Sequence, residues 1–69
     1  MEQLSQKLKE LRLEKGMSAY EVSLALGLTR NAYSHYENGR RLPSLTVFLK
    51  ICTLFNVSAD YLLGITDAP

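Results

Sequence analysis

Residues 17–39 read MSAYEVSLALGLTRNAYSHYENG, and this stretch decides the fold. Ser18 is followed three residues later by Glu21, which is the spacing of a capping box at the start of a helix. These residues predict a short helix over residues 19–26. Gly27 then supplies the left-handed position at which many helices end.

A second helix is predicted over residues 30–38, because Thr29 is a natural N-cap and Gly39 follows the end of the periodic pattern. On a wheel of about 100° per residue, this helix has two different faces. The face expected to point inward holds Ala32, Tyr33, Tyr36 and Glu37. The opposite face holds Arg30, Asn31, Ser34 and His35. Arginine and asparagine can pair with guanine and adenine in the major groove, although a solvated polar face is the simpler alternative.

Three further helices flank this pair, and no stretch alternates apolar and polar residues as a strand would. They are predicted over residues 2–15, over residues 45–55 after the cap Ser44, and over residues 59–63 after the cap Ser58. The sequence therefore predicts an all-α fold, a compact five-helix bundle that forms a single domain over residues 1–69.

The composition excludes several classes of protein. The chain has 69 residues and one cysteine, so it has neither an internal disulfide nor a Cys/His cluster that could hold a metal. We expect Cys52 to be a core residue, because it shares a face with Phe48, Ile51 and Phe55. Ser34 adjoins His35, but side chains one residue apart on a helix diverge and do not form a nucleophile–base pair, so we expect no catalytic site, no cofactor and no small-molecule ligand.

The sequence also contains no apolar run long enough to span a membrane and no signal peptide, which predicts a cytoplasmic protein. The net charge is only +1, but the charges are unevenly distributed. Residues 29–50 carry four cations and one acid and sum to +3, whereas the remaining residues sum to −2. One basic face on a domain of low net charge is compatible with a nucleic-acid partner.

Residues 8–64 resemble the phage-repressor and Cro type of helix-turn-helix domain, also called XRE-like, and in particular the compact regulators of Gram-positive bacteria and their phages. The resemblance is carried by Leu26-Gly27-Leu28-Thr29-Arg30, by Tyr36-Glu37-Asn38-Gly39 with Pro43 four residues later, and by Asn56-Val57-Ser58 and Asp60-Tyr61-Leu62-Leu63-Gly64. It implies a lambda-repressor-like fold, with the helix-turn-helix at about residues 19–38, that binds double-stranded DNA.

The resemblance also implies roles for individual residues. The helix at 19–26 would lie across the sugar-phosphate backbone, and the helix at 30–38 would enter the major groove. The base-reading positions match Arg30, Asn31 and Ser34, and His35 matches a position that faces a base or a phosphate. The positions that hold phosphates match Thr29, Asn38, Arg40 and Arg41.

Four further expectations concern how these helices are held together. Arg12 and Glu37 match a pair that links the first helix to the end of the recognition helix. Tyr33 and Tyr36 match core positions, and we expect their hydroxyls to reach water. Ser23 stands where many members carry alanine, and we expect its hydroxyl to bond back to a carbonyl. Ala19 stands where many members carry a glutamine that braces the recognition helix, so that polar clamp is missing.

These observations predict a transcriptional regulator, specifically a repressor, that acts as a homodimer on a near-palindromic operator. Excess apolar surface on the fourth and fifth helices is the expected dimer interface. Its residues are Val47, Leu49, Leu54, Tyr61, Leu62 and Ile65. The alternative, favoured for Leu62, is that several of these residues close the small core instead. Two alternatives remain open: a protein-interaction module of the same fold, such as an antitoxin-like subunit, and a DNA-binding fragment of a longer regulator.

Overall fold

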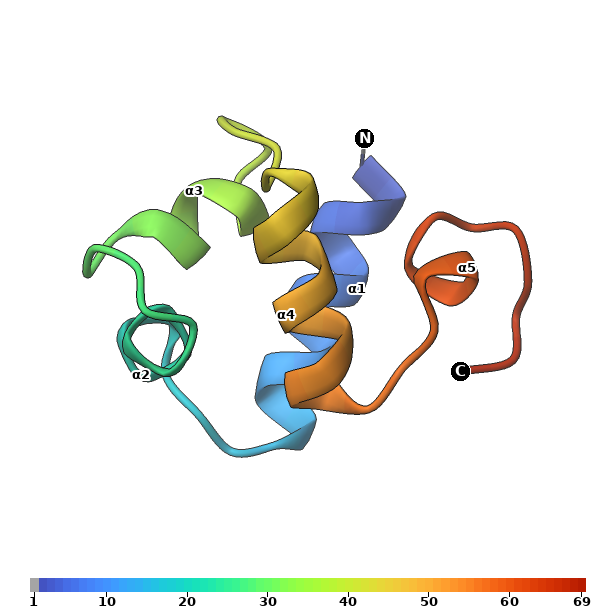
Figure 1. Ribbon diagram of the computed structural model, residues 1–69, viewed down its shortest axis with the longest axis horizontal. Helices are drawn as coiled ribbons and strands as arrows, with labels where there is room; N and C mark the ends of the chain where they lie inside the picture. Colours follow the sequence, from blue (N-terminus) through green and yellow to red (C-terminus); the bar gives the residue numbers. More distant parts are fainter. Residues whose placement is uncertain (1) are drawn as a thin grey trace.

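Five helices form the part of the chain that the computed structural model describes, which is residues 2–69, with Glu2 described only in its backbone (Figure 1). They are α1 (Glu2–Glu14), α2 (Ala19–Ala25), α3 (Ala32–Glu37), α4 (Leu45–Phe55) and α5 (Ala59–Leu62). The predicted all-α fold is confirmed, and the predicted bounds of α4 are those observed. The other helices are one to three residues shorter than predicted.

The helix starts of α2, α4 and α5 are fixed by serine caps, as predicted. The hydroxyls of Ser18, Ser44 and Ser58 accept hydrogen bonds from backbone N–H groups three residues later, at 3.0 to 3.2 Å. The carboxylate of Glu21 in turn accepts from the Ser18 N–H at 2.8 Å, which completes the capping box. Each of these helices therefore begins where its local sequence directs it to begin.

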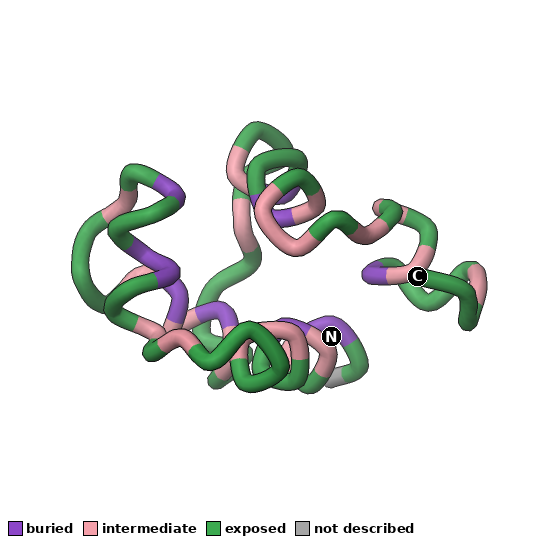
Figure 2. The backbone as a smooth tube through the Cα atoms, turned by 90° about the horizontal axis from the view of Figure 1, so that it is seen from below, coloured by how far each residue is buried: buried purple, intermediate pink, exposed green. Residues whose placement is uncertain are grey.

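The helices enclose one small core. Figure 1 shows α2 and α3 on one side of α1 and α4, and α5 on the other side. Helix α3 packs against α1 and α2, while α5 packs against α1 and α4. Figure 2 shows that all five helices contain buried residues. The buried apolar residues are Leu4, Leu8, Val22, Leu26, Tyr33, Tyr36, Phe48, Ile51 and Leu62.

Tyr33 lies at the centre of this core. Its side chain is fully buried, and its ring packs edge-on against Tyr36 at 6.2 Å between centroids and near Phe55 at 6.3 Å. Its hydroxyl donates to the carbonyl of Leu8 in α1 at 2.7 Å. The predicted core position is confirmed, but the prediction that this hydroxyl reaches water is wrong, because α1 covers it. A buried hydroxyl requires such a partner.

Cys52 is only half-buried, so it lies at the edge of the core instead of inside it. It packs against the buried cluster, as the partly buried Leu54 and Phe55 also do. Burial raises the pKa of its thiol, which keeps the sulfur in the unreactive thiol form near neutral pH.

The apolar surface predicted for a dimer differs from the surface that is exposed. Leu62 is fully buried, and Val47, Leu54 and Tyr61 are half-buried against the core, because so small a bundle needs them to close it. Leu49 and Ile65 are exposed, as predicted. The sequence analysis missed Leu45, which is exposed one turn before Leu49 on α4. It also missed Leu42 and Leu63, which are exposed around a shallow hollow that they share with Leu45. With Leu49 they form what we call the α4 apolar surface: Leu42, Leu45, Leu49 and Leu63.

Replacing Tyr33 with phenylalanine tests the buried hydroxyl. Tyr33→Phe is expected to lower the free energy of unfolding by about 1–2 kcal/mol near neutral pH, because it removes a buried hydrogen bond. Denaturant titration measures this loss. Tyr20→Phe, which changes an exposed tyrosine, is the matched control and should leave the stability unchanged.

The same variant has an expected pH dependence. Burial raises the pKa of the Tyr33 hydroxyl, so the folded protein holds this proton more tightly than the unfolded chain does. The contribution of this hydroxyl to the free energy of unfolding is full below about pH 10, which is the ordinary pKa of tyrosine. It is lost as the pH rises above that value. The stability difference between wild type and Tyr33→Phe should therefore narrow above pH 10. A constant difference from pH 7 to pH 11 would contradict this assignment.

Candidate nucleic-acid interface

The start of α3 is not set by the residue that the sequence indicated. Thr29 was predicted to cap a helix beginning at Arg30, but α3 begins at Ala32 with Asn31 in the cap position. The Ala32 N–H donates to the Thr29 carbonyl at 3.1 Å, which closes a tight turn ahead of the helix. The predicted recognition helix over residues 30–38 is therefore shorter by two residues at its start and one at its end.

Ser23 explains this difference. Its hydroxyl oxygen accepts a hydrogen bond from the backbone N–H of Tyr33 at 3.0 Å, and both residues are fully buried. In an α-helix that began directly after Thr29, the Tyr33 N–H would donate to the Thr29 carbonyl instead. We predicted that the Ser23 hydroxyl would donate to a carbonyl. The bond that links it to α3 is one in which the hydroxyl oxygen accepts. A side chain of α2 thus caps α3 from the neighbouring helix.

The predicted base-reading residues come together at one end of α3. Arg30 and Asn31 are exposed, and Ser34 and His35 are half-buried. Arg30, Asn31 and Ser34 line one shallow hollow with Tyr20 of α2. Asn31 makes no cap bond with its side chain, so its amide remains available to an incoming molecule. Their predicted contacts with bases stay a prediction.

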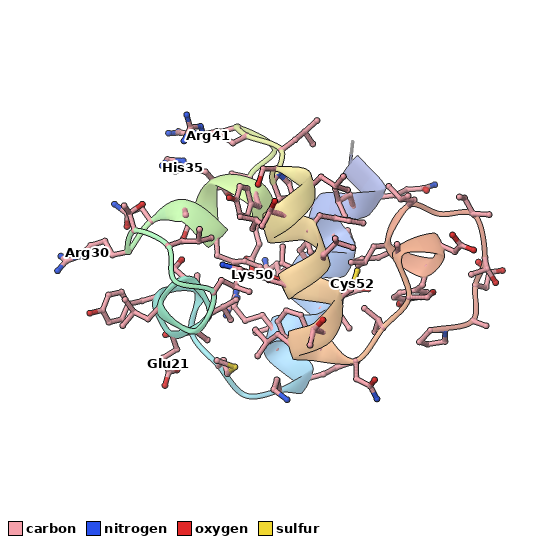
Figure 3. The ribbon with its side chains drawn as sticks, viewed as in Figure 1. Glu21, Arg30, His35, Arg41, Lys50 and Cys52 are labelled. Carbon is pink, nitrogen blue, oxygen red and sulfur yellow. The ribbon has the colours of Figure 1, made fainter. Side chains whose placement is uncertain are left out.

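The loop after α3 carries the predicted phosphate-binding residues Asn38, Arg40 and Arg41, all of them exposed. The carbonyl of His35 accepts from the N–H groups of Arg40 and Arg41 at 3.0 and 3.3 Å, which folds the loop back against the end of α3. Figure 3 shows the side chains of Arg30, His35 and Arg41 extending outward on the same side of the molecule. We use the name basic edge for the whole set of residues that the sequence predicts to contact DNA: Thr29, Arg30, Asn31, Ser34, His35, Asn38, Arg40 and Arg41.

The acids near this edge are engaged elsewhere. Glu37, the one acid in residues 29–50, receives two hydrogen bonds from the Arg12 guanidinium at 2.7 and 3.2 Å. The predicted pair is thus confirmed. Its side chains are 15% and 9% exposed, so the ion pair is largely buried. The hydrogen bond raises the pKa of Arg12 further above its ordinary value. Glu21 is held in its capping box and points away from Arg30 (Figure 3).

The arrangement offers hydrogen-bond donors and positive charge on an open surface. Arginine and asparagine side chains suit base edges, while arginines and backbone N–H groups suit phosphates. Among the described residues, no cluster of three or more His, Cys, Asp or Glu side chains could hold a metal ion. None of the helices in residues 2–69 is long and apolar enough to cross a membrane.

One residue of this surface was missed in the sequence. The ring of Tyr20 in α2 lies beside Arg30, with its centroid 5.7 Å from the guanidinium carbon. No signal in a single sequence connects two residues that are ten positions apart and separated by a turn. The contact arises from the angle between α2 and α3, which Ser23 fixes through the Tyr33 N–H.

Comparison with known proteins gives a family match. A family profile described as "Helix-turn-helix" matches residues 8–62, which include α2, α3 and the turn between them. No solved structure matches the chain.

Several regulators resemble the chain along most of its length. It is 41% identical to the HTH-type transcriptional regulator ImmR of Bacillus subtilis over 88% of this chain and 48% of that protein. It is 35% identical to the uncharacterized HTH-type transcriptional regulator YgzD of the same organism, over 83% of this chain and 86% of YgzD. It is 32% identical to the cryptic phage CTXphi transcriptional repressor RstR of Vibrio cholerae, over 77% and 48%. The chain thus spans about half of ImmR and RstR.

The ion pair that holds α3 against α1 can be tested by a double-mutant cycle. Arg12→Ala is expected to lower the free energy of unfolding by about 2–3 kcal/mol, because it removes two charge-assisted bonds to Glu37 and a third, of 3.1 Å, to the Met17 carbonyl. Glu37→Ala should cost less, and the double variant should lose less than the two singles combined. Urea titration gives all four values, with Lys9→Ala as an exposed control in α1. Additive losses would show that the two side chains do not interact.

Proposed function

This chain belongs to the helix-turn-helix family, and on that premise we propose that it is a transcriptional repressor that recognises specific sites in double-stranded DNA. The observation that carries the proposal is the basic edge, where arginines with no ion-pair partner among the described residues stand beside polar side chains that are not used in the core. The chain spans about half of ImmR and RstR, so repression as the activity of the whole protein is part of what we propose.

In the proposed complex, α3 and the turn before it lie in the major groove. Arg30 would present two parallel N–H groups to the O6 and N7 acceptors of guanine. Asn31 would pair with adenine, and Ser34 and His35 would contact the next base edges or phosphates. The half-buried Ser34 and His35 lie deeper than Arg30, which favours Arg30 and Asn31 as the main determinants of sequence.

Phosphate contacts would set the register of the protein on the duplex. Thr29 precedes α3, and Asn38, Arg40 and Arg41 follow it, so these residues flank the proposed reading helix at both ends. Helix α2 would lie across the sugar-phosphate backbone beside them.

We further propose that two copies act together on a near-palindromic operator. One recognition helix reads only a few base pairs, and a two-fold pair doubles that information. The α4 apolar surface is the proposed interface, because Leu45 and Leu49 are 74% and 54% exposed on adjacent turns of one helix. A self-complementary apolar patch is what a two-fold axis requires. The recognition helices would then lie about 34 Å apart, one turn of DNA.

Selection of bound sites from random duplexes, followed by titration, tests the DNA proposal. Arg30→Ala is expected to cost about 1–3 kcal/mol on the selected site and to relax the preference at one base position. Arg41→Ala should weaken binding to all duplexes alike and lower the slope of log K against log salt by about one. Wild-type affinity and preference in Arg30→Ala would contradict the assignment of Arg30 to base recognition.

Sedimentation of the protein with and without operator DNA tests the dimer. Leu49→Glu places a charge in the proposed interface, so it is expected to abolish cooperative binding of two copies while leaving affinity for a single half-site unchanged. Leu13→Glu is the matched control, since Leu13 is 57% exposed on α1, outside the α4 apolar surface.

Binding of one copy to a site without a repeat would contradict the dimer. Stable co-purification of a different protein that is released by Leu49→Glu would instead favour the interaction-module alternative for this same surface.

A further inference from the structure

Tyr20 and Arg30 form a contact between α2 and the turn that begins the basic edge. The guanidinium carbon of Arg30 lies 5.7 Å from the centroid of the Tyr20 ring, within the range of a cation–π interaction. Tyr20 is 48% exposed, and both residues line the shallow hollow that Asn31 and Ser34 complete. The ring therefore lies on the surface and serves the core little.

Arg30 has little else to orient it. It lies in the turn ahead of α3, outside the regular hydrogen bonds of the helix. Among the side chains of residues 3–69, no carboxylate forms an ion pair with it. A free arginine side chain loses rotamer freedom when it binds, and that loss weakens any contact it makes. The observed contact that restricts the Arg30 guanidinium before DNA arrives is the ring of Tyr20.

The type of partner matters for what Arg30 can then do. A carboxylate would occupy the N–H groups that a guanidinium also needs for pairing with a base. An aromatic ring contacts the guanidinium through its π-face and leaves the N–H groups with their hydrogen-bonding capacity. The Tyr20 ring can thus restrict the direction of the Arg30 guanidinium without occupying its N–H donors.

We propose that Tyr20 is a positioning residue for base recognition, which holds the Arg30 guanidinium toward the O6 and N7 acceptors of a guanine in the major groove. This inference rests on the proposed function, since it assigns a residue that sharpens the specificity of the same site. Tyr20 acts through Arg30, so its effect is on the one base position that Arg30 reads.

The effect of removing the ring follows from the size of such contacts. Tyr20→Leu keeps an apolar side chain of similar bulk but removes the π-face, and it is expected to weaken binding to the selected site about two- to five-fold. It should also relax the preference at the base position that Arg30→Ala relaxes. Tyr20→Phe keeps the ring and is expected to bind like wild type.

The decisive experiment compares wild type, Tyr20→Phe, Tyr20→Leu, Arg30→Ala and the double variant Tyr20→Leu/Arg30→Ala. Each is titrated against the selected duplex and the three duplexes that change the base read by Arg30. Tyr20→Leu is expected to cost nothing further once Arg30 is alanine, because its effect passes through that side chain. Equal losses in both backgrounds, or equal losses in Tyr20→Phe and Tyr20→Leu, would overturn the proposal and indicate a direct contact of Tyr20 with DNA.

A measurement without DNA separates this inference from the proposed function. In the free protein, the NMR signals of the Arg30 side chain should carry a ring-current shift that Tyr20→Leu removes and Tyr20→Phe retains. If Arg30→Ala relaxes one base position but Tyr20→Leu changes neither that preference nor the shift, only the role of Tyr20 is wrong. If wild type selects no duplex, the proposed function fails and the role of Tyr20 fails with it, whatever the shift shows.

Discussion

The burial of Tyr33 is the constraint on which the rest of this small fold depends. Three helices besides its own hold this residue. The Ser23 hydroxyl of α2 accepts a hydrogen bond from its backbone N–H, and the Leu8 carbonyl of α1 accepts one from its hydroxyl. Phe55 of α4 lies beside its ring. A 69-residue chain buries too little apolar surface to tolerate a loosely placed centre. Because these contacts meet in one side chain, the position of Tyr33 sets both where α3 begins and which of its faces is turned inward.

The character of the exposed surface follows from that orientation. With Tyr33 and Tyr36 inside, the same side of α3 brings Glu37 to Arg12, so the segment's one acid is neutralised away from solvent. The opposite side is left with cations and polar groups. The guanidinium of Arg12 also bonds the carbonyl of Met17, just before α2, and thereby ties both helices of the pair to α1. Packing and charge are therefore consequences of one helix orientation, and the low net charge of the chain conceals a basic edge.

Local rules in the sequence predict this structure well, and contacts between distant residues limit them. The caps at Ser18, Ser44 and Ser58 were predictable because donor and acceptor lie three residues apart. The same rule failed at Thr29, since the competing acceptor, Ser23, comes from another helix. The apolar surface was misplaced for a related reason: the sequence pattern favoured core closure for Leu62 but could not tell that Val47, Leu54 and Tyr61 also pack against the core while Leu45 stays exposed. The exposed cluster of Arg30 and Asn31 could be predicted from the sequence, but the place of Tyr20 beside them could not, because its contact with Arg30 depends on how two helices pack.

The cap that Ser23 provides has a consequence for how this protein can change over generations. In many helices the residue at the start must be one of a few types, because its side chain has to satisfy the exposed amides. Here a buried serine and the Thr29 carbonyl perform that task, and the side chain of Asn31 takes no part in it. Positions 30 and 31 are thus released from the selection that maintains folding. Mutation can explore new side chains there at little cost in stability, so the base preference proposed for these positions and the architecture of the domain are free to evolve separately.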